Sequence, residues 1–224
     1  MRTLLLVSLA IVVLVNSGLT AMDNDAWVQE ERPPAHAHIE HVSDAFRGTP
    51  DGVGLLSASV AEMEIAAQHA GLAVNSDDIL RIKAHIGHVV HALDPNIAES
   101  GPGKGYGGIR AAESAARHLD LATKSDGASD NIKRHAEHVN MSLQNVINWA
   151  HRTLDLARGV NASESMNAVQ ALAVEIEGIL TAILAGRDGD DEDENISWSE
   201  GEGGLAQAIS HMGFMKKGEG LSGS

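Results

Sequence analysis

Hydrophobic residues recur along much of the chain at steps of three and four, the spacing of one face of an α-helix. The clearest stripe follows Ser76, Asp77 and Asp78, residue types that favour a helix N-terminus, and consists of Ile79, Ile82, Ile86, Val89, Val90 and Leu93. Longer stripes cover 132–154 and 166–184, and shorter ones cover 35–47, 55–73, 108–123 and 203–215. No segment shows the alternation of a strand, so the pattern predicts an all-α fold.

Glycine, proline and charged residues interrupt these stripes and divide the chain. Because the connections between neighbouring stripes are mostly short, we expect antiparallel helical hairpins packed into one bundle-like domain. The expected parts are a signal peptide (1–21), a flexible N-terminal segment (22–34), a histidine-rich helical bundle (35–186), an acidic loop (187–202), a last helix packing back on the bundle (203–215) and a flexible tail (216–224).

The N-terminus has the pattern of a secretory signal peptide. Arg2 precedes the apolar run from Leu4 to Val15, and the small residue Ala21 lies near the expected exit. The run is shorter than the roughly 20 residues that a membrane-spanning helix needs. The sequence therefore predicts export, to a periplasmic or extracellular location, and no membrane span after removal of the signal.

Charge and cysteine content exclude several classes of function. The net charge is −15, and no cluster of Lys and Arg is present that could neutralise a phosphate backbone. We therefore expect no nucleic-acid partner, whereas an acidic protein attracts cations. The chain has no cysteine, so disulfides and thiolate metal sites are excluded.

Twelve histidines stand out in this composition, and many fall in an internal repeat. Three segments share the pattern His-x-x-His-Val-x-x-x-apolar: His38, His41, Val42 and Phe46; His85, His88, Val89 and Leu93; His135, His138, Val139 and Leu143. Each is followed by a second predicted helix that carries a lone histidine, at His69, His118 and His211. The pattern predicts three hairpins, the third interrupted by the histidine-free stripe and the acidic loop.

Histidines three apart are neighbours on one helix face, and here each pair flanks the apolar stripe. A third imidazole from the partner helix would complete a three-histidine set, which suits Zn²⁺ or Cu²⁺. Pairing within each hairpin gives the candidate sets His38, His41 and His69; His85, His88 and His118; and His135, His138 and His211. Exchange of partners between hairpins is also open. Glu64 and Glu113, each five residues before its lone histidine, are candidates for a fourth ligand or for orienting an imidazole.

These observations predict an exported, histidine-rich protein that binds copper or zinc ions for storage, delivery or buffering. One alternative is a haem- or metal-cluster-containing redox protein or metalloenzyme, in which the same histidines hold non-covalent haem or a catalytic metal. A pH-responsive histidine cluster and a helical interaction protein without ligand are further alternatives. No HExxH motif is present, so metalloprotease chemistry is not indicated.

Two other motifs are weaker. The segment Gly103–Gly108 spells GxGxxG, but no strand precedes it, so a flexible hairpin loop is favoured over a dinucleotide site. The acidic run that begins at Asp188 lacks the glycine and the final glutamate of an EF-hand. A solvated linker is the favoured interpretation of that run.

Overall fold

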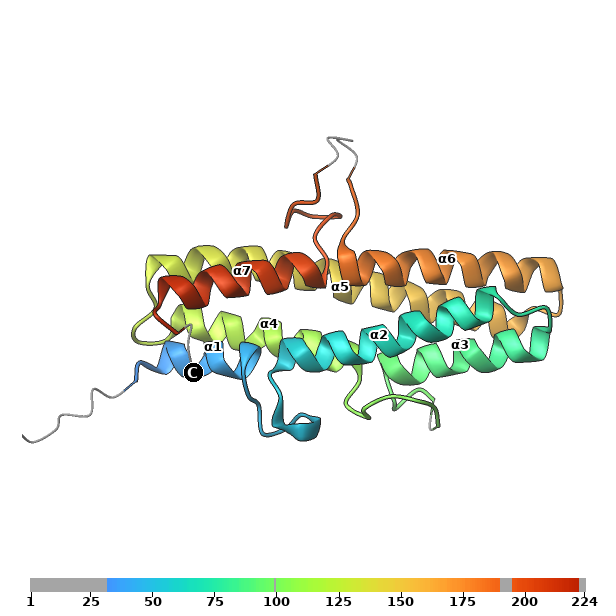
Figure 1. Ribbon diagram of the computed structural model, residues 1–224, viewed down its shortest axis with the longest axis horizontal. Helices are drawn as coiled ribbons and strands as arrows, with labels where there is room; N and C mark the ends of the chain where they lie inside the picture. The colour runs from blue at the N-terminus through green and yellow to red at the C-terminus, as the bar shows by residue number, and fades with distance from the viewer. Residues whose placement is uncertain (1–31, 99, 190–194, 222–224) are drawn as a thin grey trace, which may run out of the picture. The chain divides into compact units, whose positions relative to one another are not determined.

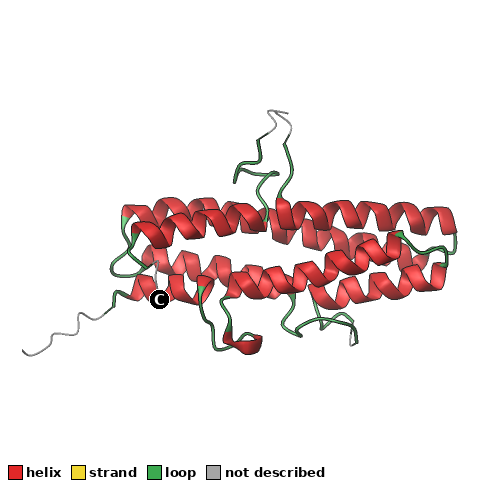
Figure 2. Cartoon of the chain, viewed as in Figure 1, coloured by secondary structure: helices red, strands yellow, loops and turns green. Residues whose placement is uncertain are grey.

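The computed structural model describes residues 32–98, 100–189 and 195–221. The predicted signal peptide and nearly all of the predicted segment 22–34 lie outside these residues. The described helices are α1 (Pro34–Ser43), α2 (Leu55–Val74), α3 (Ile79–Leu93), α4 (Gly108–Lys124), α5 (Asp130–Ala162), α6 (Met166–Ala185) and α7 (Leu205–Gly218), with a short 3₁₀ turn at Pro50–Gly52. The described part of the chain contains no strand, which confirms the all-α prediction (Figure 2).

The seven helices form four columns that lie side by side (Figure 1). Helix α5, with 33 residues, is a column by itself and spans about 50 Å at 1.5 Å per residue. The other columns each consist of two helices arranged end to end: α1 with α2, α3 with α4, and α6 with α7. A loop leaves each of these columns at the junction between its two helices.

Glycines make these end-to-end junctions possible. Gly54 directly precedes α2, and a Cβ there would lie 2.6 Å from the carbonyl carbon of Ser43, the last residue of α1. Gly204 precedes α7, and a Cβ there would lie 2.5 Å from the carbonyl oxygen of Ala182 in α6. Gly107 likewise directly precedes α4, and a Cβ there would contact the end of α3. A helix can therefore restart against the end of the previous one only where no side chain intervenes.

An aliphatic core joins the columns. Ile39, Leu93, Leu119, Leu143 and Ile176, from five different helices, are each fully buried. Each helix starts within two residues of its predicted stripe. The predicted cap at Asp78 accepts from the N–H of Leu80, and Ser129, which was not predicted, caps α5 by accepting from that of Ile132. The expected stripes thus give the observed helices, one face of each being buried.

Three predicted helix ends were wrong. Helix α5 continues to Ala162, beyond the stripe that ended at residue 154, because Ala157 and Val160 extend its buried face. Helix α1 ends at Ser43 instead of 47, since the chain turns away toward Thr49 and Pro50. Helix α7 ends at Gly218, so the first residues of the predicted tail are helical.

The predicted hairpins are wrong for the first four helices. Helices α1 and α2 lie end to end, as do α3 and α4, so neither pair packs side by side as a hairpin. Instead α2 packs along α3, and α1 packs along α4. Helix α5 packs along α7, as predicted. The choice of packing partners decides which histidines meet.

Sequence analysis predicted no membrane-spanning segment after the signal peptide, but helix α6 is long and apolar enough to cross a membrane. Among the described residues it is the one helix that passes a test of length and composition for crossing a membrane, with a mean hydropathy of 1.7. Its residues Val169, Ala173, Ile176, Leu180 and Ile183 are buried, and the helix packs along α5 and α2. A core helix of a bundle has the same composition, so the test alone does not distinguish the two.

Candidate metal centres

The first triad consists of His38 and His41 of α1 and His118 of α4. The two histidines of α1 lie three positions apart and therefore project from the same side of that helix. The Nδ1 atom of His118 lies 3.0 Å from Nδ1 of His38 and 3.4 Å from Nδ1 of His41. Three imidazole nitrogens from two helices therefore meet at one point.

The second triad consists of His85 and His88 of α3 and His69 of α2. The short connection between Val74 and Ile79 makes α2 and α3 antiparallel neighbours, which brings the end of α2 alongside the middle of α3. Nδ1 of His69 lies 3.2 Å from Nδ1 of His85 and 3.3 Å from that of His88. The arrangement of nitrogens matches that of the first triad.

The third triad consists of His135 and His138 of α5 and His211 of α7. Nδ1 of His211 lies 3.2 Å from Nδ1 of each of the other two. In all three triads the potential ligand atoms lie within 4.8 Å of one another, and all nine rings are partly buried. The described residues contain no further cluster of three or more such side chains.

The nitrogen–nitrogen distances suit a single transition-metal ion. Metal–nitrogen bonds of about 2.0–2.1 Å separate two ligand nitrogens by about 2.9 Å at a right angle and about 3.3 Å at the tetrahedral angle. The six measured distances lie between 3.0 and 3.4 Å. One nitrogen of each triad therefore lies at the distance from its two partners that a shared ion requires, and all three potential ligand atoms lie within 4.8 Å of one another.

Hydrogen bonding alone does not account for such a set. A neutral imidazole nitrogen either donates one proton or accepts at one lone pair. The central nitrogen of each triad has two close nitrogen neighbours, so only one of the two contacts can be a hydrogen bond. A shared cation would satisfy all three lone pairs at once.

Electrostatics keeps the rings in the form that binds metals. Burial, followed by the positive charge of His41 and His38, lowers the pKa of His118 to about 4. Burial is also the largest cause that lowers the pKa of His69 in the second triad and of His211 in the third. These lowered pKa values keep His118, His69 and His211 neutral at pH 7, and a neutral imidazole is the metal ligand.

The surroundings of the triads differ. In the first triad, Phe46 lies edge-on to His41 and His118, with ring centroids 5.4 and 5.3 Å apart. In the third, the Trp198 indole stacks on His138 at 3.9 Å and 12°, and the ring of Phe214 lies 5.7 Å from that of His211.

The second triad has no such aromatic wall. Within the described part of the chain, the rings of His69, His85 and His88 make ring contacts only with one another. The same three ligands are therefore present in three different environments.

The structure brings together the three histidines of the third predicted set, but it does not group the histidines of the first and second sets as predicted. Pairing within hairpins placed His69 with His38 and His41, and His118 with His85 and His88. The structure exchanges the two lone histidines, because α1 packs along α4 and α2 packs along α3. All nine histidines nevertheless belong to a triad.

The two predicted glutamate ligands do not join the triads. Glu64 and Glu113 are exposed, and neither belongs to a cluster of potential ligands. A residue five positions before a histidine lies about 140° away from it around a helix, so the two side chains leave on nearly opposite sides.

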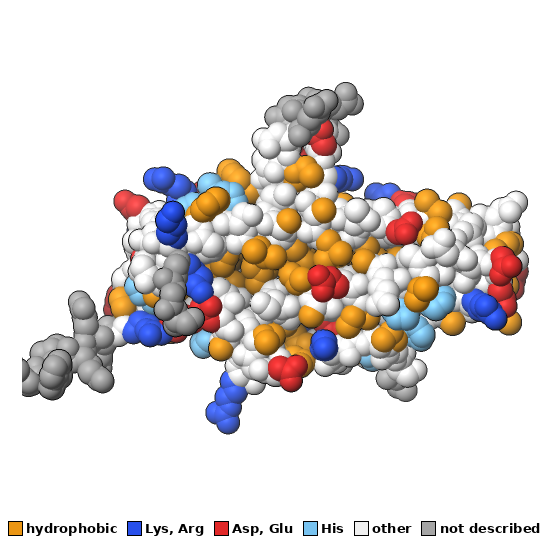
Figure 3. Space-filling model, viewed as in Figure 1, with side chains coloured by type: hydrophobic (Ala, Val, Ile, Leu, Met, Phe, Trp, Pro, Cys, Tyr) orange, Lys and Arg blue, Asp and Glu red, His pale blue; other side chains and the backbone are white. Residues whose placement is uncertain are grey.

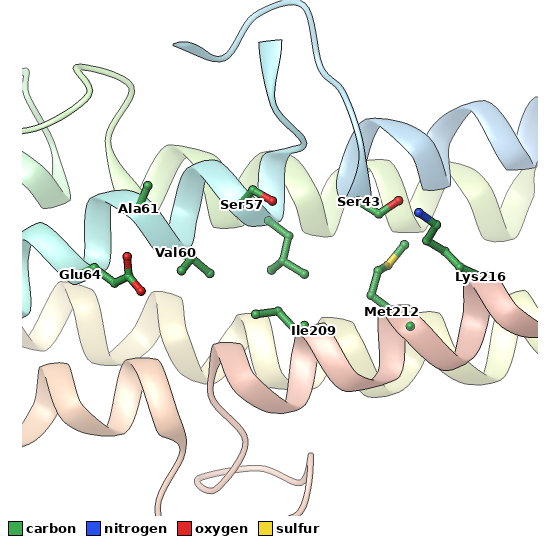
Figure 4. A pocket seen from close by; sticks show the side chains of 10 residues that line it. Ser43, Ser57, Val60, Ala61, Glu64, Ile209, Met212 and Lys216 are labelled. Atoms are coloured by element: carbon green, nitrogen blue, oxygen red, sulfur yellow. The ribbon is translucent and has the colours of Figure 1, made fainter. Parts of the chain in front are cut away.

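Glu64 instead lines an apolar groove between α2 and α7, together with Val60, Ile209 and Met212 (Figure 4). No histidine lines this groove, which has a volume of about 430 Å³. Hydrophobic side chains gather in a band along this face of the bundle (Figure 3). The groove and the triads are therefore separate features.

Three histidines lie outside the triads. His36 pairs through Nε2 with Glu219, at 3.1 Å, and Nδ1 of His91 lies 2.5 Å from the carbonyl oxygen of Ala98. His151 is exposed on α5.

The GxGxxG segment is held by a carboxylate that sequence analysis missed. Glu62 of α2 is 1% exposed and accepts hydrogen bonds from the backbone N–H groups of Lys104, Tyr106 and Gly107, at 2.9, 2.9 and 3.1 Å. The N–H groups that a phosphate would need are thus taken by the protein's own side chain. The segment is an anchored connection between α3 and α4, whereas a flexible loop was expected.

The aromatic walls were also missed as part of the sites. Phe46 carried a signal, because it occupies the last position of the first repeat. Trp198 carried none, since it lies 60 residues from His138 in a segment of low apolar content.

The chain matches no family model, and the comparisons with curated proteins and with solved structures found no match.

Proposed function

We propose that this protein binds transition-metal ions, copper or zinc, one at each triad, and serves in their storage, delivery or buffering. The observation that carries the proposal is the convergence of nine partly buried imidazoles as three sets, in each of which the Nδ1 atom of one histidine lies 3.0–3.4 Å from the Nδ1 atoms of the other two. Imidazole suits both metals, and affinity rises from zinc to copper. The net charge of −15 adds a field that favours cations.

An ion accounts for these distances better than haem. Two axial ligands of a haem iron lie on opposite sides of the porphyrin, about 4 Å apart at bond lengths of about 2.0 Å. The close nitrogen pairs, such as the 3.0 Å between His38 and His118, leave no room for a macrocycle between them. We also propose export, on the basis of the signal-like N-terminus, to a compartment where a cysteine-free site resists oxidation.

Native mass spectrometry after loading with Cu²⁺ or Zn²⁺ and desalting tests the proposal. We expect three ions per chain, and two in the double variant His85→Ala, His88→Ala. The variant His151→Ala is the matched control, because this exposed histidine lies outside the triads, and it should retain three ions. A wild-type protein without bound ions, or an unchanged count in the double variant, would contradict the proposal.

A further inference from the structure

The three triads offer the same ligands but do not complete the coordination of an ion. Each cluster contains three nitrogens, and among the described residues no carboxylate or fourth histidine joins any of them. Structural zinc sites have four protein ligands, whereas sites with three keep a position for water or another external ligand. The nine rings are only partly buried, so solvent reaches each triad.

From the different walls of these sites we propose that the triads have divided roles, an inference that rests on the proposed function. The ion in the second triad accepts a small monodentate donor, such as azide or imidazole, and exchanges readily. The ion in the third triad is retained behind Trp198. Release of a metal to an acceptor normally begins with entry of an external ligand, so the second triad is the exchange site.

Trp198 is a fixed wall and not a loose side chain. Its indole stacks on His138 and lies perpendicular to His211, with centroids 6.4 Å apart. The next residue, Ser199, accepts a 2.8 Å hydrogen bond at its carbonyl from the side-chain amide of Asn145, which is 4% exposed. The carboxylate of Glu202 accepts from the N–H and hydroxyl of Ser197, at 3.0 and 2.6 Å.

These bonds attach the residues that follow Trp198 to Asn145 of α5, and they join Ser197, on the other side of Trp198, to Glu202 of the same segment. Asn145 also accepts from the N–H of Gly201, at 2.9 Å, and donates to the carbonyl of Gly203, at 3.0 Å. Under this proposal an entering ligand meets an indole whose segment is anchored to α5. At the second triad no aromatic ring has to move. The first triad, with Phe46 edge-on to two of its rings, should be intermediate.

Proteins with one triad each provide the test. Replacing His38, His41, His135 and His138 by Gln leaves the second triad, and replacing His38, His41, His85 and His88 by Gln leaves the third. Each protein is loaded with Cu²⁺, titrated with azide while its charge-transfer absorption is followed, and then mixed with excess EDTA to measure release. We expect an azide band and fast release from the second triad, and a weaker band with slower release from the third.

The substitution Trp198→Ala in the protein with only the third triad identifies the wall. Because aromatic stacking is worth about 0.5–1.5 kcal/mol, release should become roughly 2- to 13-fold faster. Ile196→Ala is the matched control in the same segment, since this exposed side chain makes no ring contact with the histidines. In the intact protein, Trp198→Ala should speed only the slow phase of release, which keeps the test valid if a fourfold variant fails to fold.

Equal azide responses and equal release rates from the two triads would overturn the division of roles. An unchanged rate in Trp198→Ala would overturn the role of the indole. Both results would leave the proposed function intact. Failure of the wild-type protein to retain any Cu²⁺ would instead refute the proposed function, and the division of roles with it.

Discussion

The second and third triads have the same ligands in different settings. Both combine two histidines three apart on one helix with a single histidine of a neighbour, and both have nitrogen distances near 3.2 Å. The second lies between two helices joined by a four-residue connection, with no aromatic wall. The third lies beside a segment that inserts Trp198 against His138. Helix packing therefore sets the geometry of the ligands, whereas the loops decide which aromatic rings lie against them.

The largest effect is expected from replacing the one histidine of a triad whose Nδ1 atom lies close to those of both others. His69→Ala should abolish tight binding at the second triad and leave the third unchanged, and His211→Ala should do the reverse. Loss of a residue that only hydrogen-bonds to a metal ligand costs roughly 10–100-fold in metal affinity. Loss of the ligand itself should therefore cost more than about 100-fold. Competition with a chromophoric chelator measures each affinity. If both sites weakened equally in either variant, the triads would not be separate sites.

A smaller effect is expected from the amide that anchors the wall of the third triad. Asn145→Ala removes two donated bonds and one accepted bond, and it takes this partner from the N–H of Gly201 and the buried carbonyl of Gly203. We expect a loss of about 1–3 kcal/mol in the free energy of unfolding, measured by urea denaturation. Release of metal from the third triad should become faster, whereas release from the second should not change. An effect of equal size on both triads would mean that Asn145 acts through the bundle as a whole.

Acid should lower the stability of the metal-free protein against unfolding through the histidines of both triads. Since burial lowers the pKa of His69 and His211 in the folded state, the unfolded chain binds more protons at these sites. The neutral rings therefore contribute their full stability at pH values above about 6.5, the pKa of histidine in the unfolded chain. It is lost as pH falls from there toward the lowered values, which reach about 4 for His118. Thermal melts followed by circular dichroism between pH 7 and 4 should show a falling Tm, and a Tm that rises over this range would contradict the burial.

The smallest effect concerns α7, which carries His211. Gly213 is exposed within this helix, and a Cβ there would meet nothing within 4 Å. Gly213→Ala should therefore stabilise the protein by up to about 1 kcal/mol, because alanine favours a helix interior. Gly204→Ala at the junction with α6 should do the opposite, since its Cβ would lie 2.5 Å from a carbonyl oxygen. Differential scanning calorimetry compares the two, with metal binding at the second triad as the unaffected reference.

Much of the helical structure was predictable, because its causes are local. Asp78 and Ser129 cap the helices that follow them, and the apolar stripes continue as long as a helix has a core to face. The end of α5 was predicted too early, because the stripe was taken to end at residue 154 and only the small residues Ala157 and Val160 continue the buried face. The anchoring of Gly103–Gly108 by Glu62 could not be predicted, since it joins residues more than 40 positions apart.

The sequence by itself determined that His38 and His41, His85 and His88, and His135 and His138 are neighbours, because helical periodicity places residues three apart on one face. It also determined that each pair stands beside an apolar stripe. Only the tertiary structure decided that His118 completes the first triad and His69 the second, since this depends on helices that meet end to end at glycines such as Gly54. It likewise decided the position of Trp198, which buried bonds to Asn145 fix and no local pattern encodes.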